Sequence, residues 1–148
     1  MNGIILIGLQ ASGKSSFFLS QFYKTHFRLS MDMLKTRNRE RILFNACLEA
    51  KQPVVIDNTN PTIFDRKKYI NAFKEHKFEV IGYYFESRIE ECLKRNELRT
   101  GKERIPDVGL KGTFNKLELP NVSEGFDKLY YVSMEKDGFK IAEWKDEI

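Results

Sequence analysis

The chain has 148 residues, of which 41% are hydrophobic and 31% charged, with a net charge of +4 at neutral pH. This length and composition predict a single globular domain over residues 1–148. No run approaches the roughly 18 apolar residues of a membrane span, and the start does not resemble a signal peptide. With two cysteines and two histidines, neither a disulfide framework nor a structural metal site is expected. We therefore expect a cytoplasmic protein with no membrane partner, in which Cys47 and Cys92 are core residues.

The first motif is the segment Gly8–Ser15, which reads GLQASGKS and fits the pattern G-x-x-x-x-G-K-[ST]. The apolar run 4–7 before it is typical of a buried strand, and residues 16–23 after it have helical spacing. In this context the backbone N–H groups of the loop and the helix N-terminus bind phosphate. Lys14 is then expected on the β- and γ-phosphates of ATP, and the Ser15 hydroxyl on Mg²⁺. The residues predicted to bind the nucleotide are Gly8, Ala11, Ser12, Gly13, Lys14, Ser15 and Ser16.

The rest of the chain alternates between predicted strands and helices. Strands are expected at 27–31, 54–57, 78–85, 128–132 and 139–144, and helices at 32–51, 61–76, 87–99 and 105–116. This order predicts an α/β fold, a doubly wound and mainly parallel sheet of the P-loop NTPase type. The turn Lys136-Asp137-Gly138 predicts a C-terminal hairpin at the sheet edge.

Two of the helices allow more detailed predictions. The 32–51 helix is expected to be amphipathic, with an apolar stripe made of Ile42, Leu43, Ala46, Cys47 and Ala50. The 61–76 helix is expected to begin with Pro61, with Thr59 or Asn60 as its cap.

Two aspartates follow predicted strands and should meet the phosphate loop at the carboxyl edge of the sheet. Asp57 ends an apolar strand, where a carboxylate orients the magnesium shell; the alternative is a turn or capping residue. Asp32 follows the second strand and could accept a proton from an attacking hydroxyl. On the residues alone, Asp32 is equally well explained as the N-cap of the 32–51 helix.

Basic residues gather in the middle of the chain, with seven Lys or Arg against three Asp or Glu over residues 24–51. Such a surplus suits a partner rich in phosphate, and ordinary solvated helix faces explain it equally well. The segment 94–104 could close over bound phosphates as a lid, or be a solvated helix end. Its basic residues are Lys94, Arg95, Arg99, Lys102 and Arg104.

Four blocks in order resemble the kinase module of polynucleotide 5′-hydroxyl kinases, P-loop enzymes of nucleic-acid end repair. They are GLQASGKSS at 8–16, Ser30-Met31-Asp32, VIDNTNP at 55–61 with Arg66 beyond, and Lys94-Arg95-Asn96 with Arg99. The resemblance covers nearly the whole chain, and D-N-T-N-P after a strand is its most specific part. It implies an enzyme that uses ATP and Mg²⁺ to phosphorylate the 5′ end of a nucleic acid.

The resemblance also implies roles for individual residues. Lys14 and the general base Asp32 would be catalytic, as would the lid arginine Arg99, with Arg95 as a second candidate. Ser15 and Asp57 would serve the metal. The acceptor would be contacted by Lys35, Thr59, Asn60 and Arg66. Phage members often place an arginine near the position of Lys35, and because lysine offers a point charge in place of a planar fork, its grip on an acceptor phosphate is expected to be looser.

Two other functions stay open from the sequence. One is a small-molecule kinase acting on a nucleoside, a nucleotide or a sugar nucleotide, as in the toxin-type relatives of this P-loop group. The other is a regulatory ATP-binding module without transferase activity. A basic acceptor opening at Lys35, Arg37, Arg39 and Arg41 favours an oligonucleotide acceptor, and a closed apolar opening favours a small one.

Overall fold

The computed structural model describes residues 1–145, except for the side chain of Lys102. The strands are β1 (Asn2–Ile7), β2 (Phe27–Leu29), β3 (Val54–Ile56), β4 (Glu79–Phe85), β5 (Lys128–Glu135) and β6 (Gly138–Glu143). The α-helices are α1 (Lys14–Gln21), α2 (Met31–Leu34), α3 (Arg37–Ala50), α4 (Ile63–Glu75), α5 (Ile89–Glu97) and α6 (Asp107–Lys116). Two 3₁₀-helices, η1 (Gly101–Glu103) and η2 (Val122–Glu124), complete the described elements.

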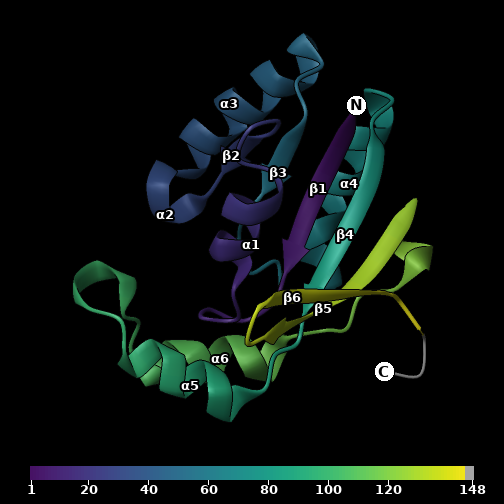
Figure 1. Ribbon diagram of the computed structural model, residues 1–148. Coiled ribbons are helices and arrows are strands. Elements are labelled where there is room, and N and C mark those ends of the chain that lie inside the picture. The colour runs from purple at the N-terminus through teal and green to yellow at the C-terminus, as the bar shows by residue number, and fades with distance from the viewer. Residues whose placement is uncertain (146–148) are drawn as a thin grey trace.

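The six strands form one sheet in the order β2-β3-β1-β4-β5-β6. All neighbouring pairs are parallel except β5 and β6, which form an antiparallel hairpin at the edge. The predicted fold class and the C-terminal hairpin are therefore confirmed. The parallel strands share one carboxyl edge, and Figure 1 shows α5 and α6 lying beyond the carboxyl ends of β1 and β4.

The sheet separates two apolar clusters because successive strand residues face opposite sides. On one side, Ile5, Val54 and Val80 pack with residues of α3 and α4 such as Phe44 and Phe73. On the other side, residues such as Val55 and Phe85 pack with Phe17 and Phe18 of α1. Among the described residues, no helix is long and apolar enough to cross a membrane.

The predicted 32–51 helix is wrong as a single element. It is interrupted after α2 by Lys35, whose φ is 73°, and Thr36 starts α3 by accepting a hydrogen bond from the Arg39 N–H. A threonine that caps a new helix at this point competes with continuation of the old one. The interruption turns the short α2, which carries Asp32, away from the axis of α3, as Figure 1 shows.

The apolar stripe of α3 also differs from the prediction. Its buried apolar residues are Phe44, Cys47 and Leu48, whereas Ile42, Ala46 and Ala50 are exposed. The physical reason is that α3 rests on α4, where the Phe44 ring packs edge-on against Tyr69 and Phe73. Cys47 and Cys92 are both buried, as predicted.

The α4 cap was also predicted at the wrong residue. The helix begins two residues later than expected, and Thr62 caps it by accepting from the Asp65 N–H. Thr59 and Asn60 are thereby left in the loop between β3 and α4, where Thr59 contacts Gly8 of the phosphate loop and Asn60 contacts Leu6 of β1.

Candidate active site

The Gly8–Ser15 loop follows β1 directly and holds a conformation suited to an anion. Ala11 and Gly13 have φ values of 63° and 103°, in the left-handed region that turns successive N–H groups toward one centre. The positive φ of Gly13 favours glycine, whereas an added Cβ, 2.8 Å from Sδ of Met134, would only displace the end of that exposed side chain. The backbone conformation of the Gly8–Ser15 loop is therefore suited to binding a phosphate group.

Lys14 is held by hydrogen bonds to the backbone of its own loop. Its Nζ donates to the carbonyl oxygens of Gly8 (2.9 Å) and Leu9 (2.6 Å), and the side chain is buried. Burial lowers the pKa of Lys14 to about 8, while the carboxylates of Asp57 and Asp32 partly oppose the shift. A bound phosphate group would raise this pKa again, because opposite charges favour each other's ionised form.

Among the described residues, two buried polar atoms of the loop have no hydrogen-bond partner. They are Oγ of Ser12 and Oε1 of Gln10, the latter on a side chain whose Nε2 donates to Thr113. Because buried hydroxyls almost always form hydrogen bonds, Ser12 Oγ is placed to serve a ligand. The left-handed turn, Lys14 and this free hydroxyl together fit the phosphates of a nucleotide.

Ser15 and Asp57 form the predicted metal-side pair. The Ser15 hydroxyl donates to Oδ2 of Asp57 at 3.0 Å, although the two residues lie 42 positions apart. Asp57 is buried, whereas Ser15 is exposed at the start of α1. A hydroxyl and a carboxylate are oxygen ligands of the kind Mg²⁺ prefers, so the two side chains fit a magnesium site. Ser16, on the next position of α1, is also exposed.

Arg28 joins this pair and was not predicted. Its Nε donates to Oδ2 of Asp57 at 2.7 Å, and its Nη2 donates to Oγ of Ser15 at 3.0 Å. The only signal in the sequence was an arginine in a short apolar strand. That signal does not reveal which strand end the guanidinium reaches.

Asp32 is exposed in the first turn of α2, where it caps neither helix. The N-cap positions of α2 and α3 are Ser30 and Thr36, so the capping alternative for Asp32 does not hold. Its charge slightly opposes the burial that lowers the pKa of Lys14, and it does so less than the charge of Asp57. The carboxylate is open to solvent just after the carboxyl end of β2.

The position of α2 is set by Asn58. Its Oδ1 accepts from the Met31 N–H at 2.9 Å, and its Nδ2 donates to Oε2 of Glu40 at 3.2 Å. Glu40 is buried, and Oε2 also accepts from the Tyr69 hydroxyl at 2.8 Å. Burial, with a contribution from Glu40, raises the pKa of Tyr69, which keeps its hydroxyl protonated as a donor. This network fixes the helix that carries Asp32.

The Asn58–Pro61 loop holds the start of the phosphate loop. The Thr59 carbonyl accepts from the Gly8 N–H at 3.0 Å, and Asn60 Nδ2 donates to the Leu6 carbonyl at 2.7 Å. Asn60 is buried and has a φ of 45°, a conformation that asparagine tolerates better than most residues. The acceptor roles of Thr59 and Asn60 stay predictions.

Arg66 does not reach the predicted acceptor pocket. It is fully buried, with Nε and Nη2 donating to the Glu124 carboxylate and Nη1 to the Asn60 carbonyl. This burial contradicts the substrate role predicted for Arg66, because no face of the guanidinium is open to an acceptor. Arg66 instead supports the Asn58–Pro61 loop by donating to the Asn60 carbonyl. Its ion-pair partner, Glu124 of η2, lies 58 positions away, so sequence spacing could not identify it.

The predicted lid arginines lie on and after α5. Arg95 donates from Nη1 to the Ala11 carbonyl of the phosphate loop at 3.1 Å. Arg99 is half-buried and close enough to Lys14 to lower its pKa. Asn96, fully buried, donates to the Ile105 carbonyl and accepts from its N–H, which closes the 97–104 loop at its base. Arg95 therefore contacts the phosphate loop, and the lid role of both arginines stays a prediction. Asn96 is a supporting residue that was missed.

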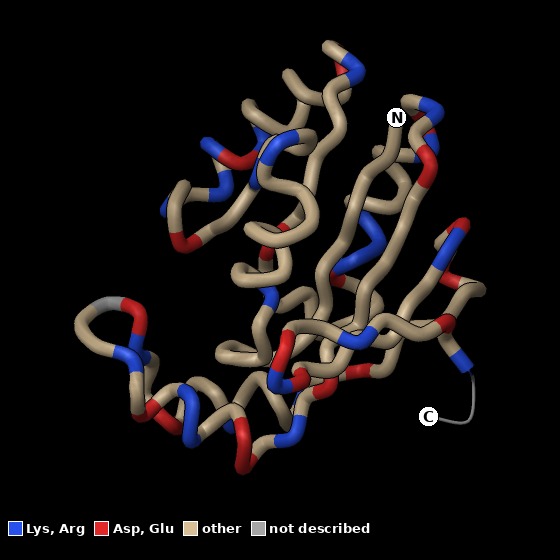
Figure 2. The backbone as a smooth tube through the Cα atoms, viewed as in Figure 1, with Lys and Arg blue, Asp and Glu red and all other residues tan. Residues whose placement is uncertain are grey.

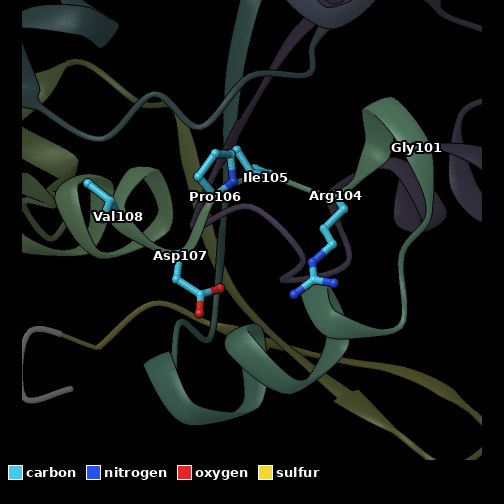
Figure 3. Close-up of a pocket in the computed structure, with 6 residues that line it drawn as sticks. All are labelled: Gly101, Arg104, Ile105, Pro106, Asp107 and Val108. Atoms are coloured by element: carbon cyan, nitrogen blue, oxygen red, sulfur yellow. The ribbon is translucent and has the colours of Figure 1, made fainter.

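Two cavities lie elsewhere in the described part of the chain, and neither is lined by a residue of the phosphate loop. The first, about 440 Å³, lies after the lid and is lined by Gly101, Arg104, Ile105, Pro106, Asp107 and Val108. Figure 3 shows Arg104 and Asp107 extending on the same side of this segment. The second, about 410 Å³, lies between α3 and α4 and is lined by Arg37, Glu40, Arg41, Phe44, Lys68 and Tyr69.

The basic residues after α2 only partly face the second cavity. Arg37 and Arg41 line it, whereas Arg39 donates to the Leu34 carbonyl and Lys35 is exposed at the break between α2 and α3. Figure 2 shows blue segments on α3 and, mixed with red ones, along α5. Basic residues therefore lie on both of these helices, but on α5 they are interspersed with glutamates.

Comparison with known proteins adds relatives to this geometry. A family model described as an AAA domain matches residues 4–111. A bifunctional polynucleotide phosphatase/kinase of Schizosaccharomyces pombe is 30% identical over 127 residues, 83% of this chain and 31% of the relative. An L-seryl-tRNA(Sec) kinase of Methanococcus maripaludis is 26% identical over 143 residues, 84% of this chain and 55% of the relative.

A solved structure shares the fold at lower identity. A gluconokinase from Sinorhizobium meliloti has a TM-score of 0.63 at 19% identity, covering 89% of this chain and 82% of that one. This likeness concerns the fold alone. The two sequence relatives are longer than this chain, which spans about a third of the first and about half of the second.

Proposed function

The chain belongs to the AAA domain family of P-loop proteins, and on that premise we propose that it is an ATP- and magnesium-dependent kinase acting on the 5′-hydroxyl end of a polynucleotide. The observation that carries this proposal is Asp32, an exposed carboxylate just after the carboxyl end of β2, on a helix that Asn58 holds through the Met31 N–H. The similarity to the S. pombe polynucleotide phosphatase/kinase supports the same acceptor.

Asp32 acts as the general base in this proposal. The acceptor oxygen forms a bond to the γ-phosphorus while the bond from that phosphorus to the β–γ bridging oxygen breaks. The bridging oxygen leaves with ADP, and the hydroxyl proton passes to the Asp32 carboxylate. An exposed carboxylate suits this role because an incoming hydroxyl can approach it.

The donor groups divide the remaining work. ATP supplies the γ-phosphoryl group, and Mg²⁺ supplies charge neutralisation beside Ser15 and Asp57. Lys14 leaves the Gly8 and Leu9 carbonyls for the phosphates, and Ser12 Oγ donates to them. Arg99 and Arg95, at the lid, provide positive charge for the oxygens of the transferring group. Hydrogen bonds from the Asn58–Pro61 loop to Gly8 and Leu6 hold the phosphate loop in position beside these groups.

The cavity between α3 and α4 supports a polymeric acceptor. Three cations and one carboxylate line it, and its carboxylate, Glu40, is joined through Asn58 to the backbone beside Asp32. Arg37 donates to both Glu40 and Tyr69, so its guanidinium is held in place at the cavity. A strand whose 5′ end lies at Asp32 could place a phosphate at this cationic cavity, where it would gain affinity without base specificity.

A small-molecule acceptor is the second candidate, favoured by the open path to Asp32, which a nucleoside could use as readily as a strand end. An acceptor screen with γ-labelled ATP separates the two. It compares 5′-hydroxyl DNA, 5′-hydroxyl RNA, a nucleoside and a nucleoside 3′-phosphate, with Lys14→Met as the background control. We expect transfer to the polynucleotides to exceed transfer to the nucleoside.

The other outcomes of the screen are equally informative. Transfer to the nucleoside alone would overturn the proposal and show that the acceptor is a small molecule. Binding of ADP without transfer to any acceptor would favour a regulatory nucleotide-binding module.

A further inference from the structure

The guanidinium of Arg28 occupies the metal side of the candidate active site. Oδ2 of Asp57 accepts from both Arg28 Nε (2.7 Å) and the Ser15 hydroxyl (3.0 Å), and Ser15 Oγ accepts from Arg28 Nη2 (3.0 Å). Each of the three side chains therefore contacts the other two. The two oxygens in this triangle are the same two that the proposed function assigns to Mg²⁺.

The fold delivers Arg28 to this place from the edge of the sheet. Arg28 lies on β2, opposite Val55 of β3, and so faces the same side as α1. Its guanidinium lies 5.8 Å from the centroid of the Phe18 ring on α1, and its side chain is only 30% exposed. A packed, partly desolvated arginine held by two hydrogen bonds is an ordered part of the site.

The hydrogen bonds of the Ser15 hydroxyl conflict with coordination of a divalent cation by the same oxygen. The Ser15 hydroxyl gives its one proton to Asp57 and uses one of its two acceptor positions for Arg28. A magnesium ion at Ser15 would share this oxygen with a guanidinium and lie beside its positive charge. Two like charges a few ångström apart in a partly buried site repel each other appreciably.

We propose that Arg28 competes with Mg²⁺ for the Ser15–Asp57 pair and thereby sets the metal affinity of the enzyme. Arg28 neutralises the buried Asp57 while the nucleotide site is empty, and it yields when the metal arrives with the nucleotide. It is a positioning residue, acting through Ser15 and Asp57. This inference rests on the magnesium role in the proposed function and is independent of which acceptor is used.

The test measures Mn²⁺ binding to the enzyme–ADP complex by the loss of the free-ion electron paramagnetic resonance signal, since Mn²⁺ shares the oxygen preference of Mg²⁺. Arg28→Gln removes the charge, and we expect its Mn²⁺ Kd to fall about three- to tenfold below that of the wild type. Arg28→Lys keeps the charge without the two-pronged donor and should stay near the wild type. Lys128→Gln, at the amino end of β5, is a control for net charge and should change nothing.

The outcomes separate the possible roles of Arg28. An unchanged or higher Mn²⁺ Kd in Arg28→Gln would overturn the competition, and a weaker ADP affinity with unchanged Mn²⁺ affinity would assign Arg28 to the phosphates. If the wild type takes up no Mn²⁺ with ADP, the magnesium role and the competition fall together. Arg28→Met, which keeps the stem packed on Phe18, provides the same readout if the glutamine variant does not fold.

Discussion

On the donor side of the site, Lys14 and Asp57 are buried and held by neighbouring groups, whereas on the acceptor side the reactive carboxylate is exposed. Lys14 is held by two carbonyls of its own loop, and Asp57 by Ser15 and Arg28. Asp32 instead lies exposed on a four-residue helix that is positioned from behind by Asn58. The difference suggests a division of labour: the donor side is preorganised for one ligand, and the acceptor side stays open for an incoming hydroxyl.

The strongest test of this division is Asp32→Asn. We expect kcat to fall by about 10²–10⁴-fold, the usual contribution of a general base, with little change in ADP affinity, because Asp32 contacts no group of the phosphate loop. Steady-state kinetics and ADP titration measure the two effects. Asp65→Asn, a first-turn aspartate of α4 outside the site, is the matched control. A parallel loss of ADP binding would place Asp32 on the donor side and break the comparison.

Arg66→Met tests the support beneath the donor side. Removing Arg66 leaves the Glu124 carboxylate buried without its partner, so the free energy of unfolding should drop by about 3–5 kcal/mol. Denaturant unfolding measures this drop. The double variant with Glu124→Met should recover part of the loss because it removes both charges. Unchanged stability with weaker oligonucleotide binding would instead restore the acceptor role first predicted for Arg66.

Lys14 provides a test based on pH. Its pKa is lowered to about 8, below the ordinary 10.5, so above pH 8 the free protein has largely lost this proton. Bound phosphates raise the pKa again, and ADP binding at about pH 9 should therefore take up protons. At neutral pH the lysine is already charged and the uptake disappears. Calorimetry in two buffers of different ionisation enthalpy measures the uptake.

The same measurement on Lys14→Met is the control, and this variant should show no uptake above pH 8. Proton release, or an uptake that survives in Lys14→Met, would show that another group titrates. The preorganised donor side would then not depend on a desolvated lysine.

The smallest expected effect concerns the acceptor side. Lys68 lines the cavity between α3 and α4, whereas its neighbour Lys67 does not. We expect Lys68→Gln to reduce the slope of log affinity against log salt concentration by about 0.7–1 for a single-stranded oligonucleotide, with Lys67→Gln unchanged. Fluorescence anisotropy over a salt series measures both. Equal effects of the two variants would assign the binding to general surface charge and not to the cavity.

Much of the fold could be predicted because strand and helix periodicities depend on neighbouring residues. The mainly parallel α/β sheet and the terminal hairpin are confirmed. Asp57 directly follows β3 as expected, and Asp32 lies in the short helix just after β2. Errors arose where two local preferences competed. Residues 32–51 have a continuous helical pattern, but Lys35 and Thr36 divide it, and the buried stripe of α3 follows its packing against α4.

The sequence by itself determined the phosphate loop, because Gly8–Ser15 carries its geometry within eight contiguous residues flanked by a strand and a helix. Only the tertiary structure decided what surrounds that loop. Arg28 meets Asp57 and Ser15 because β2 pairs with β3 in one register, and Arg66 meets Glu124 across 58 positions of chain. Such partners depend on strand register and on the path of distant loops, and no local pattern in the sequence encodes either.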